Sequence, residues 1–237
     1  MSFQKKSISI DERQAKSTAW ALTFADVVTL LLTFFVLLLV MLNDAEKSIN
    51  LEIDKLLDKT YQEMIQNLES DKIVIERETK GIKITLKGNL FKSASSDIEP
   101  QYLPLIKKIG NIIKQSDLIN IEEKGQYEKL LKTIEKRGSL LNVEVRCEGH
   151  TDDAALPKES QYPSNWELSA SRSLKLVRIM NKSALMPEKY FSAMGYGEFR
   201  PIVDITSISN FKDKKIARAS NRRVEVYLDA FLVEKIE

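Results

Sequence analysis

The longest apolar run in the chain spans residues 19–42, AWALTFADVVTLLLTFFVLLLVML, and Asp26 is its single charged residue. At about 1.5 Å rise per residue, a helix from Trp20 to Leu42 would cover roughly 33 Å, which is enough to cross the hydrocarbon core of a bilayer. A cleaved signal peptide would have a shorter apolar region followed by a small-residue cleavage site, whereas MLND follows here. The pattern therefore predicts one uncleaved transmembrane helix over residues 19–42.

Polar residues recur inside this run with helical spacing. They lie three, three and four positions apart and share one stripe of the helix: Thr23, Asp26, Thr29 and Thr33. A charged aspartate at mid-helix costs on the order of 3 kcal/mol on insertion scales, so Asp26 should face protein or water rather than lipid. We predict an ion site or relay at Asp26, shared with partner helices, with the three threonines facing the pore. The alternative is an acid near the interface that only snorkels or caps.

Charges on either side of the run indicate its orientation. Basic residues precede it and acidic residues follow it: Lys5, Lys6, Arg13 and Lys16 before, Asp44 and Glu46 after. The positive-inside rule then places the tail of residues 1–18 in the cytoplasm and the large C-terminal part outside. Trp20 would mark the cytoplasmic interface.

Residues 44–70, within a linker that we place at 43–71, have a helical period with one apolar face and one charged face. The apolar face contains Ile49, Ile53, Leu56, Leu57, Thr60, Tyr61, Met64 and Leu68. An amphipathic helix directly after a membrane span could pair with a second copy of the chain, lie on the membrane or cover a pore mouth. From composition alone, a dimer stalk is the favoured interpretation.

From about Lys72 the pattern changes to short strands and helices. Two β-rich runs flank Lys80-Gly81, which is typical of a hairpin. The remaining predicted elements are strands at 142–149, 190–197 and 222–229 and helices at 100–115, 123–138 and 164–183. Ser164 followed by Glu167 three positions later predicts a capping box for the last of these helices. Together they predict an α/β (α+β) sandwich over residues 72–237, with helices on one face of a mixed sheet.

Composition argues against several classes of function. The net charge of +2, from 36 basic and 34 acidic residues, indicates no nucleic-acid partner. Cys147 is the only cysteine, so no internal disulfide is possible, and we predict an inert, partly buried thiol. His150 is the only histidine and cannot form a histidine-based zinc cluster, so we expect it to have a structural, hydrogen-bonding role. Because no positioned nucleophile is visible, we predict no enzyme activity, no metal and no cofactor.

The stretch from Glu148 to Arg172 combines a strand end, the residues His-Thr-Asp-Asp, a loop and a helix start. Such places leave backbone N–H groups free for anionic ligands. Asp152 could take an ammonium group, and Arg172 could hold a carboxylate in a bidentate pair. A ligand that carries both groups, such as the zwitterionic end of an amino acid, would fit between them.

The motifs GHTDD, SNWELSASR, GYGEFRP and ASNRRVEVYL follow in this order within residues 84–229. They resemble the OmpA-like peptidoglycan-binding domain, in the version found in flagellar stator B subunits (MotB and PomB). The resemblance implies that Asp152 and Arg172 clamp the diaminopimelate, or equivalent amino-acid, end of the peptide stem. The further site residues that it implies are Thr151, Asn165, Leu168 and Arg223, with one of the adjacent Arg222 and Arg223 structural. The stretch 117–141 is longer than usual for this family.

The transmembrane run independently resembles the membrane helix of the same subunits, whose single aspartate carries the ion. The resemblance implies that Asp26 carries a transported proton or sodium ion, and that a plug within Asp44–Thr60 blocks ion leak. It implies a homodimer of this chain inside a pentamer of a multi-span A subunit of MotA, PomA or ZorA type. The protein would span the bacterial inner membrane and contact its lipid, with a periplasmic C-terminal domain bound to the peptidoglycan peptide stem. Its function would be to convert ion flow into torque for flagellar rotation.

Two other functions are open at this point. The Zorya anti-phage system has a MotB-like subunit, ZorB, of the same build, and the short chain and compact linker suit that interpretation too. A passive OmpA-like cell-wall tether is the other alternative, but a tether needs no intramembrane acid, so Asp26 argues against it. An envelope hydrolase is disfavoured because no catalytic set is visible. The choice between proton and sodium is also open.

Overall fold

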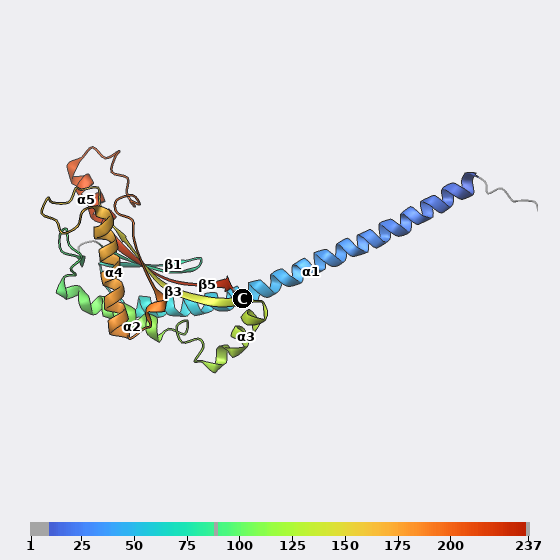
Figure 1. Cartoon of the computed structure of the whole chain (residues 1–237), viewed down its shortest axis with the longest axis horizontal. Helices are drawn as coiled ribbons and strands as arrows, with labels where there is room; N and C mark the ends of the chain where they lie inside the picture. Colours follow the sequence, from blue (N-terminus) through green and yellow to red (C-terminus); the bar gives the residue numbers. More distant parts are fainter. Residues whose placement is uncertain (1–9, 88–89, 236–237) are drawn as a thin grey trace, which may run out of the picture. The chain divides into compact units, whose positions relative to one another are not determined.

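The computed structural model describes residues 10–87 and 90–235, without the side chains of residues 10–18 and 42–46. The chain divides into two compact units, Met1–Asn50 and Leu51–Glu237. Helix α1 (Ile10–Asn67), drawn from blue to cyan in Figure 1, is continuous over its whole length.

The first unit contains an apolar segment of membrane-spanning length. Ala19–Met41 has 23 residues and a mean hydropathy of 2.6, and no other helix in the described part of the chain meets the same criteria of length and composition. Every side chain in this segment is exposed. A long, apolar and fully exposed helix matches a lipid environment or the helices of partner chains, not water. The fold thus has the one N-terminal apolar helix that the sequence predicts.

The last part of α1 belongs to the second unit and packs there. From Ile53 onward, the apolar face is buried at Ile53, Leu56, Leu57, Thr60, Met64 and Leu68. Arg77 of β1 pairs with Asp54 and Asp58 at 2.8 Å each. The sequence suggested that this face would pair with a second copy in a dimer stalk, but the chain's own domain covers it. Burial against the domain removes the same apolar surface from water as a dimer would.

The segment that seemed long for the family helps to hold α1 in place. Asp117 is buried, and its carboxylate lies 2.8 Å from the Lys59 ammonium of α1 and also pairs with Lys124. The Tyr127 hydroxyl donates to the same carboxylate at 2.7 Å. These contacts hold the pKa of Asp117 well below its usual range, although burial alone would raise that pKa. A buried carboxylate satisfied by three partners ties the 117–127 stretch to α1.

The second unit is built on a five-stranded sheet in the order β1-β2-β5-β3-β4. Its strands are β1 (Ile73–Glu78), β2 (Gly81–Lys87), β3 (Ser139–His150), β4 (Phe191–Gly195) and β5 (Arg223–Glu234). β1 and β2 form the predicted hairpin, with Glu78 opposite Gly81. β5 runs antiparallel to both β2 and β3, and β4 runs parallel to β3. The sheet is therefore mixed, as predicted.

Helices cover one face of this sheet. The helices of the unit after α1 are α2 (Leu103–Gln115), α3 (Glu128–Lys136), α4 (Asn165–Ala184) and α5 (Phe211–Asn221), with single 3-10 turns at Pro100–Tyr102, Gly125–Tyr127 and Glu188–Tyr190. α2 and α4 pack together, and α4 also packs on β3 and β4 (Figure 1, α4 in orange). Cys147 lies fully buried under these helices, and burial raises the pKa of its thiol to about 12. The thiol is therefore inert, and more deeply buried than predicted.

Alternation along the central strands separates the apolar face from a polar one. On β5, Val224, Val226 and Leu228 enter the core, opposite Gly149, Cys147 and Val145 of β3. The intervening positions carry charge on the other face, where Glu225 lies directly opposite Glu148. Two like charges opposite each other destabilise a sheet unless cations neutralise them, and arginines on this face do so.

Candidate functional site

A pocket of about 460 Å³ opens where β3 ends and α4 begins. Three parts of the chain and the isolated Arg222 line it. The three parts are the loop Phe91–Ala94, the stretch Thr151–Pro157 (except Asp153), and Asn165, Leu168 and Arg172 of α4. Strand ends and helix starts meet here, so backbone N–H groups and short polar side chains surround the space. Five of the six residues predicted to bind peptidoglycan line this pocket: Thr151, Asp152, Asn165, Leu168 and Arg172.

Close backbone contact places α4 against the strand that leads into the pocket. A Cβ atom at Gly149 would lie 2.1 Å from the Ser169 carbonyl oxygen. A Cβ atom at Gly195 would lie 2.4 Å from the Ala170 backbone nitrogen. Only glycine permits this approach, and it brings the first turns of α4 onto the ends of β3 and β4. The local sequence therefore sets the distance between the two walls of the pocket.

Asp152 provides the negative charge of the pocket. Its side chain is only 11% exposed, and Oδ2 lies 2.5 Å from Nη1 of Arg222. Its Oδ1 accepts a hydrogen bond from the Ala154 backbone nitrogen at 3.3 Å, which closes a tight turn after the strand. The carboxylate is oriented by these two contacts and still faces the cavity.

Arg172 provides a buried positive charge. It is 4% exposed, its Nε donates to the Ser95 carbonyl oxygen at 3.0 Å, and its guanidinium carbon lies 5.0 Å from the Phe91 ring centroid. Burial lowers its pKa to about 10, although Asp152 acts in the opposite direction, so the group is charged at neutral pH. Among the described residues, no hydrogen bond reaches its two terminal nitrogens. The guanidinium fork is therefore free to hold a carboxylate in bidentate geometry.

The first residues of α4 complete the wall. Ser164 caps the helix by accepting a hydrogen bond from the Trp166 backbone nitrogen at 3.1 Å, and its hydroxyl also donates to Glu167. Asn165 donates to the carbonyl oxygens of Asp152 and Ala154 at 3.4 and 3.2 Å, so it is a positioning residue. The predicted N-cap is thus present, and the cap and the amide together fix the loop against the helix.

Thr151 adds a free hydroxyl to the pocket. Its side chain is buried, and its Oγ1 has no hydrogen-bond partner among the residues that the structure describes. A buried hydroxyl without a partner carries a desolvation cost that a polar ligand group would remove. Leu168 is also buried and closes the pocket on its apolar side.

Arg222 lines the pocket and Arg223 does not, which is the reverse of the expectation from the sequence. Arg223, the predicted ligand contact, is 6% exposed, and its Nε lies 2.7 Å from Glu225 on the polar face of the sheet. It does not line the pocket, whereas Arg222 does and pairs with Asp152. The reason is strand alternation, because Arg223 opens β5 and shares a face with Glu225. The sequence carried this signal, since Arg223 and Glu225 lie two positions apart in a strand.

The Phe91–Ala94 loop is a part of the site that the sequence pattern did not reveal. It lines the pocket, and Ala94 has a φ of 50°. A left-handed backbone at a residue other than glycine is uncommon and indicates a turn imposed by the surrounding fold. Nothing in the run LFKSASS marks it as a pocket wall.

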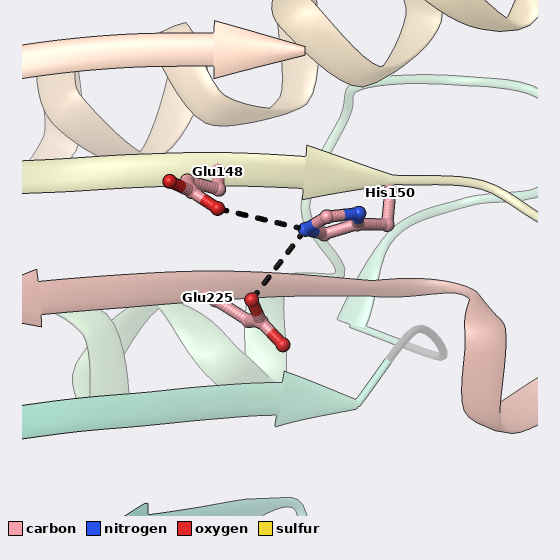
Figure 2. A group of neighbouring side chains, drawn as sticks. All are labelled: Glu148, His150 and Glu225. Carbon is pink, nitrogen blue, oxygen red and sulfur yellow. Dashed lines mark ion pairs between the residues drawn. The ribbon is translucent and has the colours of Figure 1, made fainter. Parts of the chain in front are cut away.

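Figure 2 shows a second buried cluster, formed by Glu148, His150 and Glu225 on β3 and β5. The Nε2 atom of His150 lies 3.5 Å from Glu225 and 4.0 Å from Glu148. These spacings would suit a metal ion, but Arg146 and Arg223 already pair with the two carboxylates. The arginines supply the positive charge that a metal would otherwise bring.

His150 contributes packing in place of the expected hydrogen bonds. It is 1% exposed, it stacks on Tyr196 with ring centroids 5.4 Å apart, and neither ring nitrogen has a hydrogen-bond partner in the described part of the chain. Burial lowers the pKa of this histidine, and the nearby Glu225 opposes that shift only in part. The ring is therefore neutral at pH 7, next to the residues that begin the pocket.

The polar stripe of the apolar helix has a simple local geometry. Each threonine hydroxyl donates to a carbonyl oxygen three residues earlier: Thr23 to Trp20 at 2.9 Å, Thr29 to Asp26 at 2.8 Å and Thr33 to Leu30 at 2.9 Å. Each hydroxyl thus uses its one donor within the helix, and its acceptor lone pairs stay available. No hydrogen bond or ion pair within the described residues reaches the Asp26 carboxylate. The ion-carrying role of Asp26 and the pore-facing role of the threonines stay predictions.

Comparison with known families identifies the two parts of the chain. A family model described as "OmpA family" matches residues 90–215, which is more than half of the sequence. The chain belongs to the OmpA family. A second model, described as "Membrane MotB of proton-channel complex MotA/MotB", matches residues 4–51. The chain is thus similar to MotB-type stator B subunits with an OmpA-like domain, as the motifs predicted.

The chain is also similar to individual known proteins. The "Uncharacterized protein YtxE" of Bacillus subtilis (strain 168) is 28% identical over 251 residues, covering 95% of this chain and 94% of that protein. "Motility protein B" of the same organism is 28% identical over 180 residues, covering 70% of this chain and 57% of that protein. A solved structure of a "putative MotB like protein from Desulfovibrio vulgaris" has a TM-score of 0.55 and 20% identity, over 78% of this chain and 98% of that chain. This structure supports the fold.

The family assignment also bears on location and activity. The MotB match, together with the single apolar helix of the described residues, indicates a membrane-anchored protein with a periplasmic C-terminal domain. The matched families are structural stator and envelope families, not families of enzymes. The orientation in the membrane stays a prediction, as does the absence of catalytic activity.

Proposed function

We propose that this chain is the peptidoglycan-anchored B subunit of an ion-driven rotary stator. Its C-terminal domain binds the peptide stem of the cell wall, and its membrane helix passes a proton or sodium ion at Asp26. The observation that supports the binding of the cell wall most directly is a pocket lined by one buried carboxylate and one buried guanidinium. The relative named Motility protein B favours flagellar rotation as the output.

The pocket matches a zwitterionic ligand in charge and in size. Asp152 accepts the ammonium group, and the free fork of Arg172 holds the carboxylate. The unpartnered Thr151 hydroxyl and the backbone of the strand end provide the remaining polar contacts. The family resemblance names the diaminopimelate end of the stem, or an equivalent amino acid, as this ligand. A volume of about 460 Å³ accommodates such a group with room for the chain that leads to it.

The membrane helix requires partners for its part of the function. Membership of the MotB type implies a MotA-type subunit. We propose a homodimer of this chain inside a pentamer of that multi-span subunit, so that Asp26 and the threonine stripe face a shared pore. Binding and release of the ion at Asp26 alternates its charge and steps the ring around the dimer. A membrane potential contributes about 2.3 kcal/mol per charge per 100 mV to each step.

We also propose an orientation of the chain in the membrane and a further role for α1. The N-terminus lies in the cytoplasm, the helix crosses the inner membrane in contact with lipid, and the C-terminal domain reaches the wall. The basic residues before the span and the acidic ones after it support this orientation. A plug within residues 44–60 blocks the pore until the domain is anchored. An anchored dimer is stationary, which is what a torque-generating ring needs at its centre.

Co-sedimentation with purified peptidoglycan tests the wall-binding part. We expect the full-length protein in detergent to pellet with the wall and the Asp152→Asn variant to stay in the supernatant. Asp153→Asn is the matched control, because Asp153 is the next residue and pairs with Arg218 at 2.7 Å outside the pocket lining. Equal retention of the wild type and the Asp152→Asn variant would contradict the proposal.

A further inference from the structure

A groove with a volume of about 770 Å³ lies between α2 and α4, apart from the pocket at the end of β3. The two helices meet at Gly110 and Met180, where a Cβ atom on the glycine would lie 3.2 Å from the Met180 Cβ atom. On the α2 side, Leu103, Lys107 and Asn111 line the groove at the four-residue spacing of one helix face. Within the described part of the chain, the groove and the peptide pocket have no lining residue in common.

Four cationic side chains line this groove, namely Lys107 of α2 and Lys175, Arg178 and Lys182 of α4. None of the described acidic residues lines it. The Lys175 ammonium lies 3.3 Å from the Asp97 carboxylate, and no ion pair among the described residues reaches the other three cations. The groove therefore has a positive potential that attracts anions.

The two helices lack the acidic residues that an ordinary solvated face would carry. The chain has 34 acidic residues, yet α2 has none and α4 has none after Glu167 in its first turn. Lys175, Arg178 and Lys182 lie three and four positions apart, a spacing at which like charges destabilise a helix. The helix dipole offsets this repulsion only for Lys182, which lies in the last turn. An anion bound in the groove would supply the missing negative charge.

The shape of the groove favours a linear ligand. Along α4 the cations recur about once per helical turn, and the row from Lys175 to Lys182 covers roughly 10 Å. The half-buried Leu103 and Ile179 provide apolar surface between the charges. A chain of anions joined by short carbon links can therefore place its charges on the cations and its links on the apolar side chains. A flat bilayer surface would contact only the rim of such a groove.

We infer that the groove between α2 and α4 binds a linear phosphodiester polymer of the cell envelope, with its phosphates on the four cations. The inference rests on the proposed function for the location of the domain at the wall, and it adds a second ligand at a separate site. Lysine and arginine both bind phosphate oxygens, lysine as a point charge and arginine as a fork. On the outer side of the membrane, this chemistry belongs to envelope polymers rather than to nucleic acids.

The position of the groove relative to the peptide pocket supports a ligand carried by the wall. On α4 the groove begins at Lys175, three residues after Arg172 of the pocket, which is about one helical turn. A polymer attached to the wall would thus lie within reach of the cations while the pocket holds the stem peptide. Two ligands on one scaffold bind more tightly together than either does alone, without any new contact.

Binding of a short, fluorescent poly(glycerol phosphate) to the full-length protein in detergent tests the inference, by anisotropy at several salt concentrations. We expect the Arg178→Glu/Lys182→Glu double variant to bind about 30-fold more weakly and with a smaller dependence on salt, because phosphate contacts and the counterions that they release are lost. Both residues are exposed, so the variant should fold, and calorimetry should show wild-type affinity for the stem peptide.

Lys129→Glu/Lys136→Glu in α3 is the matched control. It makes the same change in net charge at two exposed residues outside the groove, so it should keep wild-type binding of the polymer. Equal losses in the two double variants would overturn the inference, because binding would then follow net charge alone. Equal affinity for a polyglutamate chain of the same length would overturn the assignment to phosphate. Displacement of the polymer by phosphatidylglycerol in mixed micelles would assign the groove to the membrane instead.

The stem peptide separates failure of this inference from failure of the proposed function. A wild type that binds the peptide but not the polymer would overturn the inference alone. A wild type that binds the polymer but not the peptide would contradict the proposed function and leave the chemistry of the groove in place.

Discussion

Asp152 and Asp26 are the two acids on which the proposed function depends, and their surroundings differ completely. Asp152 is buried, and contacts from Arg222 and the Ala154 backbone orient its carboxylate. Asp26 lies in a segment where every side chain is exposed, and no described residue pairs with its carboxylate. One chain completes the pocket around Asp152, whereas the ion site proposed at Asp26 would be completed by partner chains.

This difference separates two kinds of failure. Changes at the pocket should remove wall binding directly and ion passage only as a consequence, because in the proposed function the plug stays closed until the domain is anchored. Changes in the apolar helix should remove ion passage and leave wall binding in place.

Asp26→Asn should abolish ion passage and motility. A neutral amide can neither bind and release a proton nor attract a sodium ion by its charge. Ion flux into vesicles that contain the complex is the measurement, and swimming of cells that carry the variant is its counterpart. The Asp26→Asn variant should still co-sediment with purified peptidoglycan as the wild type does. A variant that conducts and swims normally would remove Asp26 from the mechanism.

Arg172→Leu should weaken binding of the stem peptide by about 100-fold, the loss typical of a buried charge-assisted pair. Arg172→Lys should recover only part of the affinity, because an ammonium cannot make the bidentate contact. Calorimetric titration with the peptide measures both. Affinity equal to that of the wild type in the leucine variant would show that the carboxylate binds elsewhere.

The adjacent arginines allow a matched pair of variants. Arg223→Gln should lower the free energy of unfolding by about 3 kcal/mol, because it leaves buried Glu225 without its cation. Arg222→Gln should cost little stability, since the Arg222 side chain is 39% exposed, but it should weaken peptide binding about tenfold by releasing Asp152. Denaturant unfolding and calorimetry separate the two effects. The reverse pattern would restore Arg223 as the ligand contact.

Acid should destabilise the domain through Glu225. Burial alone would raise the pKa of Glu225, but the approach of His150 and the hydrogen bonds of Arg223 and Tyr227 bring this pKa down to about 2 from an ordinary 4.5. The stability that Glu225 contributes is present above about pH 4.5 and is lost as the pH falls towards 2.

Replacement of the carboxyl group tests this dependence on pH. Glu225→Gln should flatten the fall in stability between these two pH values, whereas the exposed Glu188→Gln should not change it. Thermal unfolding followed across this range is the measurement. Equal slopes for the Glu225→Gln variant and the wild type would contradict the assignment.

The sequence predicted most of the fold because the relevant signals are local. The Lys80-Gly81 turn, the Ser164 cap and the alternation of β3 and β5 each act within a few residues. The dimer-stalk interpretation of α1 failed for the opposite reason. An amphipathic face shows that apolar surface will be buried, but it does not show whether the same chain or another one covers it.

The candidate site divides in the same way. Asp152, Asn165 and Arg172 belong to a continuous motif, so their convergence could be predicted. The Phe91–Ala94 wall comes from a distant stretch, and only the folded chain brings it to the pocket. The loop around Gly197 likewise reaches α4 through a contact between residues far apart in sequence, from the Gly197 backbone nitrogen to the Ser169 hydroxyl.

The most direct test of the central claim is the composition of the complex that forms around Asp26. The protein would be extracted from its native membrane in mild detergent, and the subunits that accompany it would be counted by native mass spectrometry. We predict two copies of this chain with five copies of a multi-span partner. A protein that emerges with no membrane partner would contradict the account and leave a wall-binding tether in its place.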